Sequence, residues 1–138
     1  MSKILVATVK PFSAAAVQQI RTLVEENGDE FLLLEKYEDK SDLINAVKDV
    51  DALIVRSDNV DQGVIDAAKN LKIVVRAGAG YDNIDLDAAT ARDVVVMNTP
   101  GQNSNAVAEL VFGMMIYLNR NGFNGTAGIE LRNKKIGI

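Results

Sequence analysis

The sequence contains no cysteine and no histidine among its 138 residues. Without cysteine, disulfide bonds and thiolate chemistry are excluded. Without histidine, the side chain that most often transfers protons near neutral pH is missing. Metal sites built from imidazole or thiolate ligands are excluded for the same reason, and we expect no metal site. The common proton-transfer, nucleophilic and metal-dependent active sites therefore cannot be assembled from this chain alone.

Long apolar runs and an excess of basic charge are also missing. The most apolar stretch, Ala106–Leu118, contains Glu109 and is shorter than the roughly 20 residues of a membrane span. The N-terminal residues are too short an apolar run, and wrongly flanked, for a signal peptide. The 15 basic and 19 acidic residues give a net charge of −4, which offers nothing to nucleic acid or an anionic membrane. We therefore expect a cytoplasmic protein with neither kind of partner.

Short apolar runs rich in β-branched residues alternate with helical patterns in the first 98 residues. The runs predict strands at 4–9, 30–34, 52–55, 72–75 and 94–97. Five such strands alternating with four helices indicate an open, mostly parallel α/β sheet with both faces covered. The predicted fold class is α/β, a flavodoxin-like five-stranded sheet, whose strand order is taken from that class.

Helix boundaries are predicted from capping residues. Ser13, Ser41, Asp61 and Asp85 are suitable N-caps for four helices. Asn27-Gly28 is a natural end for the first of them.

The pattern changes after Pro100. Ser104 or Asn105 can cap a helix over about 104–120 that is apolar nearly all round. Such a helix is either a core element of the same domain or is buried against another subunit or a further domain, and we favour the second. The closing KKIGI predicts the first residues of a new strand. We therefore divide the chain into a domain at 1–98, and a hinge, apolar helix and beginning of a second domain at 99–138.

Polar and glycine residues follow three successive predicted strands. Arg56-Ser57 follows the third strand, Arg76-Ala77-Gly78-Ala79-Gly80 the fourth, and the turn from Asn98 to Asn103 the fifth. Ligands of open α/β sheets bind beyond the carboxyl ends of the strands. Arginine and glycine-rich backbone there suit a small anion. Each feature also has a structural reading: a solvated arginine, a turn that needs glycine, an ordinary strand exit.

The run Gly78-Ala79-Gly80 begins like the dinucleotide-binding fingerprint. Asn83 stands where that fingerprint has its third glycine, and the next helix is better capped by Asp85. We therefore interpret this segment as a substrate-side loop and not as a pyrophosphate cradle.

These motifs together resemble the D-isomer-specific 2-hydroxyacid dehydrogenases. The resemblance is carried by VRAGAGYDNID at 75–85, by VMNTP at 96–100, and by Asn103-Ser104 leading into Ala108-Glu109-Leu110. The pairing of Arg56-Ser57 with the glycine-rich run is similar to the 3-phosphoglycerate dehydrogenases of this family. The resemblance implies a substrate domain at 1–98, a dimerisation helix at about 104–120, and a nucleotide domain that begins near the end of the chain.

The resemblance also implies the residues of a substrate site. Arg56 and Ser57 would contact the carboxylate or phosphate end of the substrate. The backbone of Ala77, Gly78 and Ala79 would meet the carboxylate, and Ala79 would also lie near the nicotinamide of NAD. Asn103 and Ser104 would complete the cleft. Arg76 is either part of this site or a structural residue held by Asp82.

The catalytic arginine, glutamate and histidine of the family lie in its nucleotide domain, beyond residue 138. The resemblance therefore implies NAD-dependent oxidation of 3-phosphoglycerate by the parent enzyme, in serine biosynthesis, and no activity of this chain alone. It also implies a homodimer. Two alternatives remain open: a lobe for another hydroxyacid, such as glycerate or lactate, and a freestanding module for small-anion binding or dimerisation.

Overall fold

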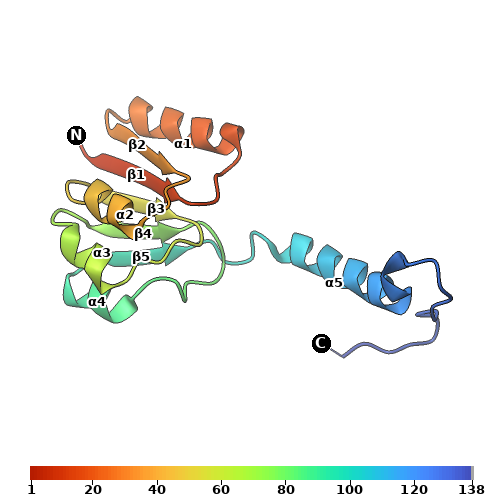
Figure 1. Ribbon diagram of the computed structural model, residues 1–138. Coiled ribbons are helices and arrows are strands. Elements are labelled where there is room, and N and C mark those ends of the chain that lie inside the picture. Colours follow the sequence, from red (N-terminus) through yellow and green to blue (C-terminus); the bar gives the residue numbers. More distant parts are fainter. Residues whose placement is uncertain (138) are drawn as a thin grey trace. The chain divides into compact units, whose positions relative to one another are not determined.

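The computed structural model describes residues 1–137 and divides into two compact units, the first ending at Pro100 and the second beginning at Gly101. The first unit is a five-stranded sheet in which every neighbouring pair of strands is parallel. Its strand order is β2-β1-β3-β4-β5, the flavodoxin-like order (Figure 1). The predicted α/β fold class is confirmed.

Strands and helices alternate through this unit. The strands are β1 (Lys3–Thr8), β2 (Glu30–Glu35), β3 (Ala52–Val55), β4 (Ile73–Arg76) and β5 (Val95–Asn98). The helices are α1 (Ala14–Glu26), α2 (Lys40–Ala46), α3 (Gln62–Ala67) and α4 (Leu86–Ala91). β4 and β5 end one residue later than predicted, because Arg76 pairs with both Val55 and Asn98.

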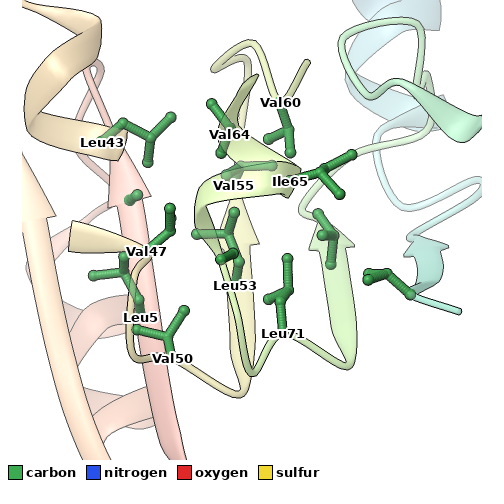
Figure 2. Packing of buried hydrophobic residues seen from close by; sticks show 14 of the residues in the cluster. Leu5, Leu43, Val47, Val50, Leu53, Val55, Val60, Val64, Ile65 and Leu71 are labelled. Atoms are coloured by element: carbon green, nitrogen blue, oxygen red, sulfur yellow. The ribbon is translucent and has the colours of Figure 1, made fainter. Parts of the chain in front are cut away.

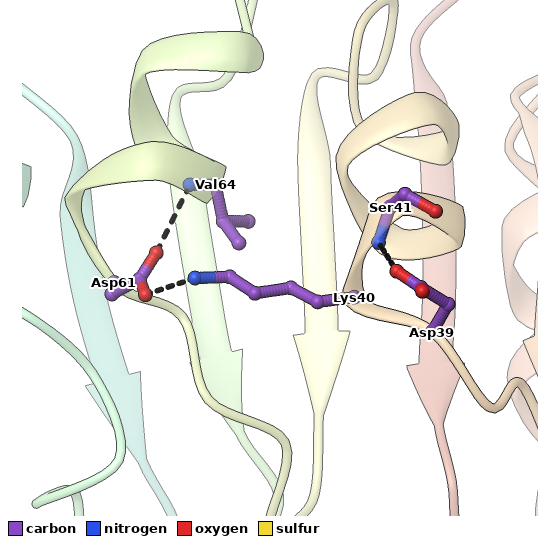
Figure 3. A network of polar contacts seen from close by, with 5 residues as sticks. All are labelled: Asp39, Lys40, Ser41, Asp61 and Val64. Carbon is purple, nitrogen blue, oxygen red and sulfur yellow. Dashed lines mark hydrogen bonds and ion pairs between the residues drawn. The ribbon is translucent and has the colours of Figure 1, made fainter.

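Three of the four predicted N-caps are confirmed. Ser13, Asp61 and Asp85 each accept a hydrogen bond from a backbone N–H in the first turn of their helix. Ser41 as a cap is wrong. α2 begins two residues earlier than a Ser41 cap would place it, because the carboxylate of Asp39 accepts the N–H of Ser41 at 2.7 Å (Figure 3).

The main hydrophobic core lies between the sheet and helices α2, α3 and α4. Leu5, Leu53 and Val55 project from the strands and are at most 2% exposed. Leu43 of α2 and Ile65 of α3 pack against them (Figure 2). At about 25 cal/mol per Å² of apolar surface, burial of such side chains is the main stabilising contribution to the sheet and to the loops that follow it.

Helix α1 covers the opposite face over β2. Phe31 alternates along β2 with Leu32 and Leu34, which pack against the main core, so Phe31 faces the other way. The guanidinium of Arg21 in α1 lies 4.4 Å from the centre of the Phe31 ring. The first unit is therefore a sheet between two helical layers.

The second unit consists of α5 (Ser104–Asn119), a short 3-10 turn η1 (Asn121–Phe123) and an irregular tail. The rings of Tyr117 and Phe123 meet edge to face at 5.5 Å. Residues 134–137 are irregular and exposed, so the strand predicted for the end of the chain does not form there, and Ile138, the last residue of that prediction, lies outside the described residues. None of the helices in residues 1–137 has the length and apolarity that crossing a membrane requires.

Candidate functional site

The loops that follow β3 and β4 leave the sheet side by side. Val55 and Arg76 are paired at the carboxyl ends of these parallel strands, so Arg56 and Ala77 are the next residues of the two loops. The N–H of Ala77 donates to the carbonyl of Val55 at 2.8 Å and holds the loops together. Arg56 and Ser57 are both exposed. The structure thus brings the predicted residues of these two loops to one edge of the sheet.

The end of β5 holds the loop that follows β4. The side-chain amide of Asn98 donates to the carbonyl of Ala79 at 2.7 Å, and the N–H of Thr99 donates to the carbonyl of Gly78 at 2.9 Å. Both carbonyls are engaged by the chain itself. They are therefore turned toward β5, and the two hydrogen bonds restrain the loop.

The N–H groups of this loop are not equally available to a ligand. Ala77 donates to Val55, and Gly78 donates to the carbonyl of Arg76 at 2.9 Å. Among the described residues, the N–H of Ala79 donates to none of the backbone or side-chain acceptors. Of the three predicted backbone donors, Ala79 is the one whose hydrogen bond is left for an anion.

Arg76 folds back over its own loop. A Cβ built on Gly78 would lie 1.2 Å from Nη1 of Arg76, so the guanidinium occupies the space that any larger residue at this position would fill. Within residues 1–137 Arg76 forms no ion pair with Asp82, so the structural partner predicted for it is wrong. The absence of a side chain at Gly78 lets the guanidinium lie there instead. Its Nε is buried and has no hydrogen-bond acceptor among residues 1–137.

The glycine-rich loop is not followed directly by a helix. Between Gly80 and the first residue of α4, Leu86, the chain makes an irregular turn in which the Asn83 side chain donates to the carbonyl of Asp58 at 2.7 Å. A pyrophosphate cradle requires the glycines to open a helix directly. The loop does not fit that role, and this chain presents no dinucleotide cradle there.

Asn103 and Ser104 belong to the second unit, at the beginning of α5. Asn103 is the N-cap residue, but its side chain makes no capping hydrogen bond, and the Ser104 hydroxyl donates to the carbonyl of Gly101 at 2.8 Å. Both side chains are exposed. Their convergence with Arg56 and Ala79 stays a prediction.

A cavity of about 490 Å³ lies at the carboxyl ends of β1, β2 and β3, where the sequence analysis named no residue except Ser57. Lys10 comes from the loop after β1, Tyr37 from the loop after β2, and Asp58 from the loop after β3. Lys40 of α2 also lines the cavity and forms an ion pair with Asp61 at the start of α3 (Figure 3). Their position directly after strands is the sequence signal that could have indicated these residues. The prediction used that signal for the third, fourth and fifth strands only.

Tyr37 and Asp58 form the polar floor of this cavity. The Tyr37 hydroxyl and the N–H of Val9 each donate to Oδ1 of Asp58 at 2.7 Å. Burial, together with the carboxylate beside it, raises the pKa of Tyr37 above its ordinary value, so the phenol stays protonated and keeps donating. Asp58 is 6% exposed, so this carboxylate lies below the surface. Its two hydrogen bonds join the loop after β3 to the loops after β1 and β2.

Comparison with known proteins shows the family of the chain. The sequence profile described as D-isomer specific 2-hydroxyacid dehydrogenase, catalytic domain, matches residues 5–129. The chain belongs to this family. The loops that follow β3 and β4 lie within the matched region, and the resemblance seen in the sequence is confirmed.

Individual members of the family are similar to the chain over most of its length. A D-3-phosphoglycerate dehydrogenase of Methanocaldococcus jannaschii is 41% identical over 113 residues, which are 72% of this chain and 22% of that protein. A hydroxypyruvate reductase of Thermotoga maritima is 38% identical over 105 residues, 75% of this chain and 34% of that protein. The chain spans less than half of each.

A solved structure of a 3-phosphoglycerate dehydrogenase is also similar to the chain. The NAD⁺-bound 3-phosphoglycerate dehydrogenase of Entamoeba histolytica is 53% identical and superimposes with a TM-score of 0.93. The match covers 96% of this chain and 44% of that one.

Proposed function

We propose that this chain is the substrate-binding lobe of an NAD-dependent D-3-phosphoglycerate dehydrogenase, which oxidises 3-phosphoglycerate to 3-phosphohydroxypyruvate in serine biosynthesis in the cytoplasm. The observation that carries the proposal is that Arg56 and Ala79 lie on the loops that follow two adjacent strands, β3 and β4, and that the N–H of Ala79 has no acceptor among the described residues. A guanidinium and a fixed backbone donor on adjacent strands suit a carboxylate.

The lobe's part in the reaction is to bind and orient the substrate. The Ala79 N–H is held in place by the bonds of Asn98 and Thr99 to the neighbouring carbonyls, so it binds an anion without rearranging. The contribution of Asn103 and Ser104 to the site stays a prediction from the family resemblance. NAD would accept the hydride in the parent enzyme. Of the predicted substrate-site residues, Ala79 is the one that would lie near the nicotinamide.

The chemistry itself belongs to other residues of the parent enzyme. The chain has no histidine to take the proton of the substrate hydroxyl and no dinucleotide cradle at its glycine-rich loop. We expect no NADH from the pure 138-residue chain supplied with NAD and 3-phosphoglycerate. NADH formation above a blank without protein would contradict this division of labour.

Binding is tested by substitution of Arg56. In calorimetric titration with 3-phosphoglycerate, Arg56→Gln should weaken the affinity by roughly tenfold or more, as expected for loss of a charge-assisted bidentate contact. Arg92→Gln is the matched control, because Arg92 follows the C-terminus of α4 and pairs with Asp66 away from the strand ends. Equal affinities for the Arg56→Gln variant and the unmodified chain would overturn the assignment.

The alternative substrate class within the family is an unphosphorylated hydroxyacid. The similarity to a hydroxypyruvate reductase supports this alternative. The same titration with D-glycerate separates the two. Equal affinity for glycerate and 3-phosphoglycerate would favour the unphosphorylated acid. Binding of neither would favour the remaining alternative, a module for other small anions or for dimerisation.

A further inference from the structure

The inference concerns the cavity at the carboxyl ends of β1, β2 and β3, and it rests on the proposed function. In the strand order β2-β1-β3-β4-β5 the direction of winding reverses between β1 and β3, and ligands of such sheets bind in the crevice at that point. Lys10 follows β1 and Ser57 follows β3, and both line the cavity. Its volume of about 490 Å³ is within the usual range of small-molecule sites.

The charges at this cavity favour an anion. Lys10 is exposed and forms no ion pair with any of the described residues. Lys40 contributes a second ammonium group, which Asp61 holds against the first turn of α3 (Figure 3). The acidic group in the lining, Asp58, is 6% exposed, and one of its oxygens is already occupied by two donors. Among the described residues, the exposed and unpaired charge of the lining is therefore the ammonium of Lys10, because Lys40 is paired with Asp61 and Asp58 is buried.

Ser57 connects this cavity to the Arg56–Ala79 pair, because it follows Arg56 directly and also lines the cavity. Neighbouring strands lie about 4.8 Å apart, so the end of β4 and the crevice between β3 and β1 are separated by one to two strand spacings. A three-carbon acid with a phosphate ester on its far carbon can span that separation. We propose that the cavity lined by Lys10 and Lys40 is the phosphate subsite, and that the carboxylate of the same substrate binds at Arg56 and Ala79.

Tyr37 and Asp58 act as positioning residues in this arrangement. Asp58 holds the N–H of Val9, next to Lys10, and the Tyr37 hydroxyl holds Asp58 from the other side. The segment that carries Lys10 is thereby fixed to the loops after β2 and β3. Specificity for a phosphorylated acid then comes from the loop after β1, and recognition of the acid itself comes from the loops after β3 and β4.

The test is an amide NMR titration of the complete chain with two probes that differ only in the phosphate, 3-phosphoglycerate and D-glycerate. Both acids should shift the amide of Ala79. Only the phosphorylated acid should also shift Lys10 and Asn59 at the cavity. Lys10→Gln should weaken 3-phosphoglycerate binding by roughly five- to tenfold and leave D-glycerate within about twofold.

Lys48→Gln is the matched control, because it removes the same charge from an exposed lysine outside the cavity. Lys40→Gln supplies a second variant with the same expected selectivity. Shifts at Ala79 without shifts at the cavity would overturn the phosphate subsite and leave the proposed function standing. Shifts at the cavity alone would support the anion site and contradict the proposed function. No shifts at either place would sink both.

Discussion

At the level of single residues, the loop after β4 depends on the fit between Gly78 and Arg76. The guanidinium occupies the position of the missing side chain, 1.2 Å from where a Cβ would lie. The clash is with the far end of a flexible side chain, so it can be relieved by moving Arg76 out of its half-buried place. A larger residue at Gly78 would therefore displace the Arg76 side chain and leave the backbone of the loop in place.

This arrangement predicts a coupled effect on stability. Gly78→Ala should destabilise the chain by about 1 kcal/mol, the lower end of the range for overpacking because the clash falls on the flexible end of Arg76, as measured by urea unfolding. In an Arg76→Ala background the same substitution should cost much less, because the space is then free, and the coupling should exceed about 0.5 kcal/mol. Strictly additive effects of the two substitutions would show that the contact has no energetic consequence.

At the level of helices and strands, the sequence predicted most of the fold because the elements are locally consistent. The apolar runs that became β1 to β5 are rich in valine, isoleucine and leucine, and Asp61 and Asp85 cap their helices as their positions suggest. Two of the errors are of one kind. Asp39 displaced Ser41 as a cap, and Arg76 turned toward Gly78 instead of Asp82, because both outcomes depend on side-chain directions that spacing does not specify.

The candidate site also has a part that the sequence predicted and a part that it did not. The residues after β3 and β4 could be placed from the sequence, because parallel strands bring their carboxyl ends to one edge. The cavity between Lys10, Tyr37 and Asp58 could not. It depends on a buried carboxylate that joins three loops, and on a strand order that the sequence alone does not show.

Asp51 joins the amino ends of three strands and predicts a pH dependence. It precedes β3, accepts the N–H of Lys3 in β1 at 2.9 Å, and pairs with Lys72, just before β4, at 3.0 Å. The hydrogen bond from Lys3, followed by the one from Lys72, lowers the pKa of Asp51 below its ordinary value. The folded state thus binds this proton more weakly than the unfolded state, so the stabilisation is complete above the unfolded pKa and is lost as the pH falls through the lower, folded one.

We therefore expect the free energy of unfolding to fall below about pH 4, and Asp51→Asn to flatten that decline. Asp49→Asn serves as the control, because Asp49 is exposed and makes no side-chain hydrogen bond among the described residues. Urea unfolding measured at several pH values provides the comparison. An acid limb of the same slope in the Asp51→Asn variant would contradict the role given to this carboxylate.

At the level of the whole molecule, α5 leaves an apolar surface uncovered within its own unit. Leu110, Met114 and Leu118 recur at four-residue spacing on one face and are 61%, 52% and 67% exposed. In the part of the second unit that the structure describes, none of the residues of α5 is buried. The occupant that we propose for this face is α5 of a second copy, in line with the dimerisation helix implied by the family.

A single charge on this face should therefore dissociate the dimer. Met114→Glu keeps a good helix former and places a carboxylate in the centre of the apolar face, so sedimentation equilibrium should show a monomer where the unmodified chain is dimeric. Gln18→Glu adds the same charge on the exposed surface of α1 and should leave the dimer intact. A monomeric unmodified chain would rule out the homodimer.

The central claim is that the loops after β3 and β4 together bind the carboxylate of a hydroxyacid. The most direct measurement is a crystal structure of the chain with 3-phosphoglycerate. We predict a carboxylate oxygen within about 3 Å of the Ala79 nitrogen, with the Arg56 guanidinium on the same ligand. A ligand bound elsewhere on the chain, with Ala79 and Arg56 both free of it, would contradict the account.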